Sequence, residues 1–302
     1  MVVARRLLQK ARDWFVFFQR GSQIQIQTQI RDDLRPTQEQ VEALWLAIDC
    51  QNDRGGSLAS YGRKYSSQSD EDGITLEVFR RIGLRRGASV EIGCGDGLEN
   101  NPLILATQGW KTLWIDGKGL AFNADCSPKS FVHRQLYVTA ENIVETILGG
   151  LGKLEIDSFD FFSVDIDGND GYLETELFQY GFRPSLAIIE TNNLMPPPIQ
   201  YQQKYAPTHI WQGLNSEYGI SLHLVAELFS RVGCQCLAIN HQTDINALFV
   251  RSDHSEFFAD IPKALMELYV GPLIQPFNQK YRKSKLTPGM AEQLIRSNGL
   301  VI

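Results

Sequence analysis

The chain has 302 residues, enough for one large domain or two small ones. Its hydrophobic content of 43% is that of an ordinary globular protein with a sizeable core. The net charge of −6 argues against broad nucleic-acid binding, because proteins of that class usually carry a basic surface. We therefore expect no nucleic-acid partner.

The N-terminal 20 residues predict a basic amphipathic helix. They lack the apolar stretch of a signal peptide, and nothing in the chain reaches the roughly twenty apolar residues of a transmembrane segment. Such a helix can lie on a membrane surface as a peripheral contact, or pack on the domain or a partner chain. A Gln-rich linker at 21–37 and a helix at 38–50 complete an N-terminal helical extension, residues 1–60.

The cysteines are odd in number and scattered, and none forms a CxxC pair. This pattern predicts reduced, buried thiols and a cytoplasmic protein, and it suggests no zinc site. The five are Cys50, Cys94, Cys126, Cys234 and Cys236.

From residue 73 onward short apolar runs alternate with helical stretches, which predicts a doubly wound parallel sheet of Rossmann-like type. The expected helices are 74–82, 97–108, 119–124, 140–148 and 171–180. The expected strands are 89–92, 112–115, 131–138, 159–166 and 186–190, followed by a hairpin at 234–240 and 246–251 that makes the last strand antiparallel. This domain spans 61–255, and 256–302 form a C-terminal helical extension.

A glycine-rich turn follows the first of these strands, where ligands bind in such sheets. A dinucleotide site has G-x-G-x-x-G, but Leu98 occupies the third glycine's position and Gly97 comes one residue early. The resulting G-x-G-x-G, after an acidic strand residue, favours S-adenosylmethionine; a dinucleotide or an empty turn is the alternative. The predicted cofactor-binding residues here are Glu91, Gly93, Cys94, Gly95, Asp96 and Gly97.

The second and third strands end in further candidates for the same ligand. Asp116, followed by Gly117, is placed to accept hydrogen bonds from ribose hydroxyls, which suits either cofactor class. The loop at Thr139 would lie beside the adenine.

An acidic segment follows the fourth strand. Strand alternation would put Asp165 and Asp167 on one face, where a cation or a functional proton must offset their repulsion. Glu190 and Asn192 follow the fifth strand and add oxygen ligands suited to Mg²⁺. Two alternatives stay open, metal-free acid–base or substrate-binding aspartates, and acids that merely cap the next helix.

Several segments in order resemble the FkbM-like methyltransferase superfamily, over about residues 61–255. The resemblance implies a seven-stranded methyltransferase fold with an antiparallel last strand, and O-methylation of hydroxyls, often on sugars or other secondary metabolites. Where the family often has Asp-x-Glu-Gly, this chain has Asp-x-Asp-Gly. The segments are 67–74, 90–97 with Asn100-Asn101, 114–117, 163–170, 211–213, 218–222 and 246–251.

We therefore predict an S-adenosylmethionine-dependent methyltransferase acting on a small-molecule or glycan hydroxyl. Asp165 or Asp167 is the base, or they hold Mg²⁺ with Glu190 and Asn192. Glu71 and Asp72 close over the cofactor from the N-terminal side, and Asp165 is a further predicted cofactor-binding residue. An NAD(P)-dependent oxidoreductase and a non-catalytic cofactor-fold protein are the other function classes.

The sequence identifies neither the acceptor nor the oligomeric state. His223 and His241 are weaker candidate bases. The long insertion at 194–220 is rich in aromatic residues, which either stack on a sugar ring or pack the loop: Tyr201, Tyr205, Trp211 and Tyr218.

Overall fold

The computed structural model describes residues 57–121, 129–211, 218–241 and 243–269. The chain divides into two units, Met1–Asp49 and Cys50–Ile302, and all described residues belong to the second. The helices expected at 1–20 and 38–50, the linker between them, Cys50, Cys126 and most of the C-terminal extension lie outside the described residues.

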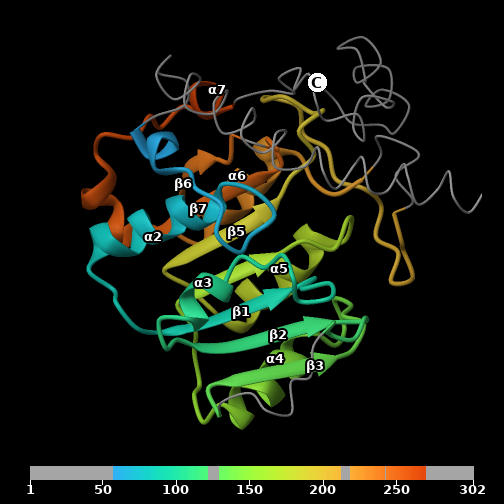
Figure 1. Ribbon diagram of the computed structural model, residues 1–302. Coiled ribbons are helices and arrows are strands. Elements are labelled where there is room, and N and C mark those ends of the chain that lie inside the picture. Colours follow the sequence, from blue (N-terminus) through green and yellow to red (C-terminus); the bar gives the residue numbers. More distant parts are fainter. Residues whose placement is uncertain (1–56, 122–128, 212–217, 242, 270–302) are drawn as a thin grey trace, which may run out of the picture. The chain divides into compact units, whose positions relative to one another are not determined.

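A seven-stranded sheet forms the centre of the described part (Figure 1). Its order is β3-β2-β1-β4-β5-β7-β6, in which β1 to β5 pair in parallel and β7 is antiparallel to both β5 and β6. This confirms the methyltransferase-type sheet with an antiparallel last strand. The strands are β1 Ala88–Ile92, β2 Lys111–Asp116, β3 Phe131–Gln135, β4 Phe161–Val164, β5 Leu186–Glu190, β6 Cys234–Ile239 and β7 Asn246–Arg251.

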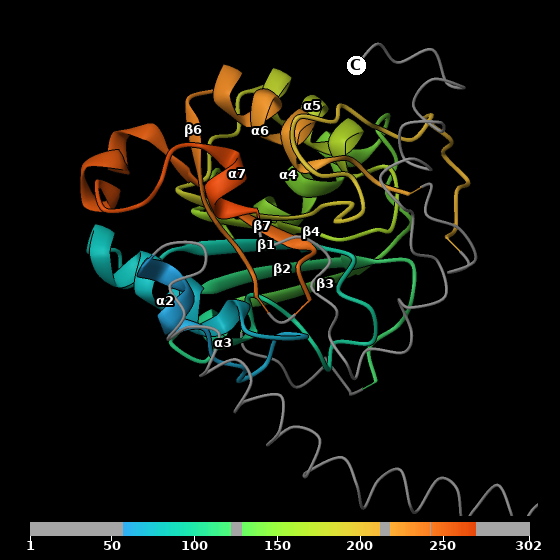
Figure 2. The same cartoon turned by 90° about the horizontal axis from the view of Figure 1, so that it is seen from above.

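Helices cover both faces of the sheet, with α2 and α3 on one face and α4, α5 and α6 on the other (Figure 2). The helices are α2 Glu71–Ile82, α3 Leu103–Ala106, α4 Ile143–Lys153, α5 Asp170–Tyr180, α6 Leu222–Arg231 and α7 Leu265–Leu268, with 3-10 helices η1 Ser57–Tyr61 and η3 Ser252–Phe258. Every residue of β1, β4 and β5 is buried, as a sheet covered on both faces requires.

Some predicted elements differ from those observed. The helix expected at 97–108 is reduced to α3, because Pro102 disfavours helical backbone in the residue before it. The strands expected at 131–138 and 159–166 end earlier, at Gln135 and Val164. Residues 119–121 are not helical. Helix α6 has no counterpart among the expected helices; its N-cap is Ser221, whose Oγ accepts from Leu224 N.

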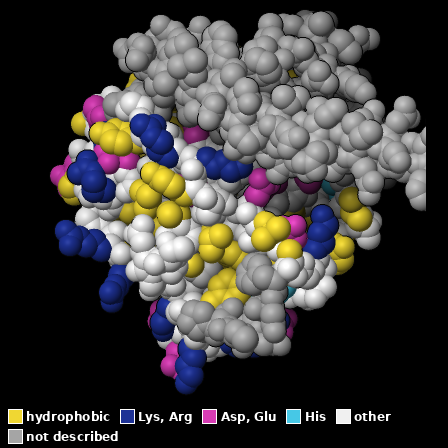
Figure 3. Space-filling view, in the orientation of Figure 1, with side chains coloured by type: hydrophobic (Ala, Val, Ile, Leu, Met, Phe, Trp, Pro, Cys, Tyr) yellow, Lys and Arg dark blue, Asp and Glu magenta, His cyan; other side chains and the backbone are white. Residues whose placement is uncertain are grey.

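The surface over this part of the chain carries no single basic patch on the face drawn in Figure 3, where Lys and Arg side chains are scattered among apolar and uncharged groups. Among the described helices, none is both long and apolar enough to cross a bilayer. The feature that positions a site is the sheet edge where β1, β2, β4 and β5 all end.

Candidate active site

A cleft of about 480 Å³ lies over the carboxyl ends of β1, β2 and β4. That volume is within the range of small-molecule sites. The residues around it come from the glycine-rich turn, the ends of β2 and β3, the loop after β4, and the insertion before α6. They include Gln68, Gly93, Cys94, Gly95, Asp96, Asn101, Asp116, Gly117, Tyr137, Val138, Asp165, Asp167, His209, Trp211 and Asn246.

Backbone geometry explains the glycines of the turn. Gly93, Gly95 and Gly97 have φ values of 88°, 55° and 83°, a left-handed conformation that side chains disfavour. A Cβ on Gly93 would lie 1.7 Å from the Asp165 carbonyl oxygen, whereas one on Gly95 would meet nothing within 4 Å. Gly93 is therefore required by contact with the loop after β4, and Gly95 leaves the backbone open toward the cleft.

The Glu91 side chain is hydrogen-bonded to the segment that follows the glycine-rich turn. Its carboxylate accepts from Asn100 Nδ2 at 2.7 Å and from Asn101 N at 3.0 Å. Burial raises the pKa of Glu91 to about 8, although these two hydrogen bonds oppose the rise. The side chain contributes to the cleft wall and holds the turn in place.

Asp116 ties the end of β2 to the turn. One carboxylate oxygen accepts from Gly95 N at 2.8 Å and the other from Lys118 N at 2.6 Å. Any side chain at Gly117 would overlap the Tyr137 ring, since a Cβ there would lie 2.3 Å from it. Asp116, Gly117 and Tyr137 thus form one wall of the cleft.

Four predicted cofactor residues do not line the cleft: Gly97, Thr139, Asp72 and Glu71. Thr139 begins the turn into α4, with its N–H donating to Asn142 Oδ1, and Tyr137 and Val138 line the cleft in its place. Asp72 is buried and accepts from the backbone of residues 65–67. Glu71 is also buried and accepts from Asn240 and Asn246. These acids hold the segment that contributes Gln68.

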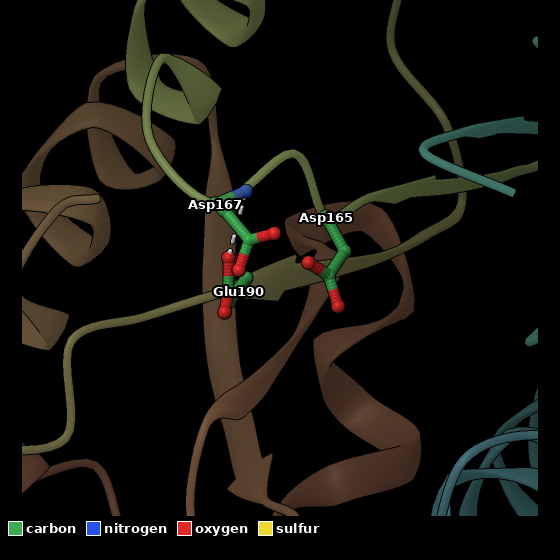
Figure 4. Close-up of side chains that lie close together, drawn as sticks. All are labelled: Asp165, Asp167 and Glu190. Carbon is green, nitrogen blue, oxygen red and sulfur yellow. Dashed lines mark hydrogen bonds between the residues drawn. The ribbon is translucent and has the colours of Figure 1, made fainter. Parts of the chain in front are cut away.

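The carboxylates of Asp165, Asp167 and Glu190 come together at the ends of β4 and β5 (Figure 4). We call these three residues the acidic cluster. One oxygen of each lies within 4.8 Å of the others. Strand β4 ends at Val164, so Asp165 and Asp167 lie in the loop after it and strand alternation is not what brings their carboxylates together. Asp167 instead has a left-handed backbone, φ 59°, and its N–H donates to Glu190 Oε2 at 3.2 Å.

Burial and the neighbouring acids raise the pKa of Asp165 to about 7. Burial and the charge of Asp165 raise the pKa of Glu190 well above its usual range. Like charges so close disfavour double ionisation, so we expect the pair to share one proton near neutral pH. Asp165 is then the ionised member and faces the cleft.

The neighbouring polar residues have structural partners. Asp170 accepts from the backbone N–H groups of Ile166 and Gly168, which precede α5, and the N-cap residue Asn169 makes no side-chain cap hydrogen bond, so the capping alternative is not observed for these acids. The predicted ligand Asn192 accepts from Leu194 N and donates to Tyr218 O, which directs its amide into its own loop.

The two predicted histidines lie elsewhere. His223 pairs with Glu227 on α6 at 3.4 Å, and His241 is buried with its backbone N–H donating to Asp70. Among the four aromatic residues of the insertion, only Trp211 lines the cleft. Tyr201 and Tyr218 are buried, and Tyr205 donates to Glu141, so loop packing accounts for those three.

Sequence reasoning missed His209, Tyr137 and Asn246 as cleft residues. Asn246 begins β7 opposite Glu190, and its Oδ1 is buried with no hydrogen-bond partner among the described residues. Only the pairing of β7 beside β5 places it there, and the sequence carries no sign of that order. His209 has no local motif, since the insertion alone brings it over the sheet edge.

The buried acids predict a stability that falls as pH rises. Acids whose pKa is raised on folding bind protons that the unfolded chain has released, so the folded state loses stability as pH rises from the unfolded pKa through the folded pKa. Glu91, at about 8, is the cleanest case. We expect a Tm at pH 8.5 that is lower than at pH 6 by about 5 °C, measured by calorimetry, and a flatter profile for Glu91→Gln. A Tm that rises over this range would contradict the assignment.

No protein-family model and no curated protein matches the chain. Solved structures similar to it include a protein of Lactococcus lactis described as a hemolysin, with 10% identity, TM-score 0.37, and coverage of 62% of this chain and 88% of that one.

Two others are methyltransferases. CalO1, from calicheamicin biosynthesis, has 11% identity, a TM-score of 0.32, and coverage of 59% and 54% of the two chains. The glycopeptide N-methyltransferase MtfA, in complex with S-adenosylhomocysteine, has 12% identity, a TM-score of 0.32, and coverage of 64% and 95%. Likenesses this distant carry no argument about activity, which must come from the cleft.

Proposed function

We propose that the chain is an S-adenosylmethionine-dependent methyltransferase that methylates a hydroxyl of a sugar or another small metabolite. One observation carries the proposal. A single cleft at the carboxyl ends of the strands has the glycine-rich turn and Asp116 on one wall and Asp165 and Asp167 on another. A cofactor held by the first wall would present its reacting end to the carboxylates of the second.

The charge of the cleft favours this cofactor over a dinucleotide. Six carboxyl groups line it, against a single lysine, Lys118. A dinucleotide brings two negatively charged phosphates, which these acids would repel, whereas S-adenosylmethionine brings a positive sulfonium and an ammonium group. The sheet order also differs from the 3-2-1-4-5-6 order typical of dinucleotide domains.

The lining residues fit the parts of S-adenosylmethionine. Asp116 keeps lone pairs for the ribose hydroxyls beside its two backbone partners, and Tyr137 with Val138 offers an apolar wall for the adenine. Gly95 lets the backbone approach the ligand, while Glu71, Asp72 and Thr139 support the wall from behind. The cofactor supplies an activated methyl group, and the protein must align an acceptor and remove its proton.

Asp165 is the proposed base. It faces the cleft, and its pKa of about 7 suits proton removal near neutral pH. Glu190 shares a proton with it from behind, which keeps the second negative charge out of the pair. Asp167 lines the cleft beside it and is placed to orient the same hydroxyl.

The acidic cluster also has the donor chemistry of Mg²⁺, which would lower the pKa of a bound hydroxyl. Asp165, Asp167 and Glu190 would hold the ion, but the amide of Asn192 already has backbone partners. Removal of divalent cations with EDTA distinguishes the metal-free base from the Mg²⁺-dependent mechanism. Activity that survives EDTA supports the metal-free base, whereas activity that is lost with EDTA and restored by Mg²⁺ supports the ion.

The described thiols fit a cytoplasmic location, which we propose for the protein. Cys94, Cys234 and Cys236 are free and buried. Burial raises the pKa of Cys234 to about 11 and that of Cys236 to about 12, so neither is a reactive thiolate at neutral pH.

The test of the proposed function is methyl transfer. Full-length protein is incubated with S-adenosylmethionine carrying a trideuterated methyl group and with a small-molecule extract of its source cells. We expect one or more extract compounds to gain about 17 mass units, because one CD₃ group replaces one hydrogen. Cofactor binding without any labelled product would favour the non-catalytic alternative.

A further inference from the structure

Two residues of the insertion between β5 and α6, Tyr205 and Ala206, are hydrogen-bonded to the loops that follow β3 and β4. They directly precede residues 207–211, most of which line the cleft, and we call this stretch the cleft segment. The loops after β3 and β4 line the same cleft. The position of the cleft segment over the sheet edge therefore depends on the contacts of these two residues.

Tyr205 contacts the loop after β3. Its Oη donates to Glu141 Oε2 at 2.6 Å and accepts from Ala140 N at 3.1 Å. Ala140 lies two residues after Val138, which belongs to the wall that we assign to the adenine. A cofactor that fixes this wall would therefore also fix the hydrogen-bond partners of Tyr205.

Ala206 contacts the loop after β4. Asn169 Nδ2 donates to Ala206 O at 2.8 Å, and Ala206 N donates to Asn169 Oδ1 at 3.4 Å. Asn169 is buried, lines the cleft and lies two residues after Asp167. The Tyr205 ring also packs on Tyr172 of α5, with ring centroids 4.9 Å apart. The insertion is thus held between the loop beside the adenine wall and the loop of the proposed base.

We propose that Tyr205 is a positioning residue that couples the cofactor wall to the cleft segment, so that a bound cofactor holds this segment in place for the acceptor. Ordering of the loop after β3 by the first ligand lowers the entropy cost of ordering the insertion around the second. The acceptor should therefore bind more tightly to the chain that already holds the cofactor. This inference rests on the proposed function, because it takes the cofactor to occupy the wall beside Val138.

The first test is amide hydrogen exchange of the full chain with and without saturating S-adenosylhomocysteine. We expect the ligand to slow exchange both at 137–139 and in the cleft segment. Tyr205→Phe keeps the ring on Tyr172 and removes both hydrogen bonds. It should keep the protection of 137–139 and lower that of the cleft segment about 5-fold, the worth of one hydrogen bond. Tyr180→Phe, an exposed tyrosine at the end of α5, is the matched control and should behave as the unsubstituted chain.

A second readout separates positioning from a general loss of activity. In methyl transfer to the small-molecule extract at saturating S-adenosylmethionine, Tyr205→Phe should raise the amount of extract needed for half-maximal rate about 5-fold. The maximal rate should change less than about 2-fold, because the proposed base and the bound cofactor keep their places.

Two results would overturn the inference. One is protection of the cleft segment that is absent, or that is equal in Tyr205→Phe, which would mean that the ligand holds this segment directly. The other is a fall in maximal rate with half-saturation unchanged. Calorimetric binding of S-adenosylhomocysteine to the same preparations separates the two proposals.

If S-adenosylhomocysteine binds and either result is found, the role of Tyr205 fails while the cofactor assignment stands. If it binds but the extract yields no labelled product, the exchange measurement decides alone. If it does not bind, the proposed function fails, and the role of Tyr205 fails with it.

Discussion

Asp165→Asn is expected to lower kcat by about 10²–10⁴-fold, the usual contribution of a positioned base. Asparagine keeps the size of the side chain but cannot take the proton from the acceptor hydroxyl. Because Asp165 lies across the cleft from Asp116, the Kd of S-adenosylhomocysteine should change less than 3-fold. Steady-state kinetics and calorimetry on the same protein measure both quantities.

The matched control is Asp157→Asn, an exposed aspartate in the loop before β4 at the opposite edge of the sheet. It should leave kcat and the Kd unchanged. Asp167→Asn should have a smaller effect than Asp165→Asn, since Asp167 orients rather than deprotonates. Full turnover in Asp165→Asn would remove the proposed base.

The pH profile follows from the same assignment. A base must be ionised to act, so kcat/KM should rise with pH and level off above the pKa of Asp165, about 7. Asp167→Asn removes a neighbouring charge that raises this pKa, so its profile should level off at lower pH. A profile that is flat from pH 5.5 to 8.5 would contradict the role of the pair.

The second large effect is on folding. Gly93→Ala should lower the free energy of unfolding by about 3 kcal/mol or more, because the new Cβ overlaps the Asp165 carbonyl and φ is 88°. In a domain of this size that corresponds to a fall in Tm of about 6–12 °C. The shift of the loop after β4 should also weaken cofactor binding.

Gly152→Ala is the control for Gly93→Ala. Gly152 lies in α4, where an added Cβ meets nothing within 4 Å, so alanine should leave the Tm unchanged or raise it slightly. Thermal unfolding followed by circular dichroism compares the two. Equal Tm values for Gly93→Ala and the unsubstituted protein would show that the turn tolerates a side chain.

The sheet was predictable because its strands are buried on both faces and read as short apolar runs. The runs at 89–92 and 186–190 correspond to β1 and β5 almost residue for residue. The position of β7 between β5 and β6 is a long-range pairing that no local pattern encodes. Helix α3 is shorter than the apolar spacing predicts, because Pro102 disfavours helical backbone in the residue before it.

The site was predictable where residues follow strand ends and not where loops fold back. Gly93, Asp116 and Asp165 line the cleft as expected from their strands. Glu71 and Asp72 were expected over the cofactor, but both are buried under backbone and amide donors. His209 reaches the cleft only through the path of a long insertion, and such paths depend on tertiary packing.

The most direct test of the cofactor assignment is calorimetric titration of the full chain with S-adenosylhomocysteine and, separately, with NADH. We expect one molecule of S-adenosylhomocysteine per chain, a loss of about 10-fold or more in affinity for Asp116→Asn, no loss for Asp157→Asn, and no heat from NADH. Binding of NADH with none of S-adenosylhomocysteine would contradict the proposed function.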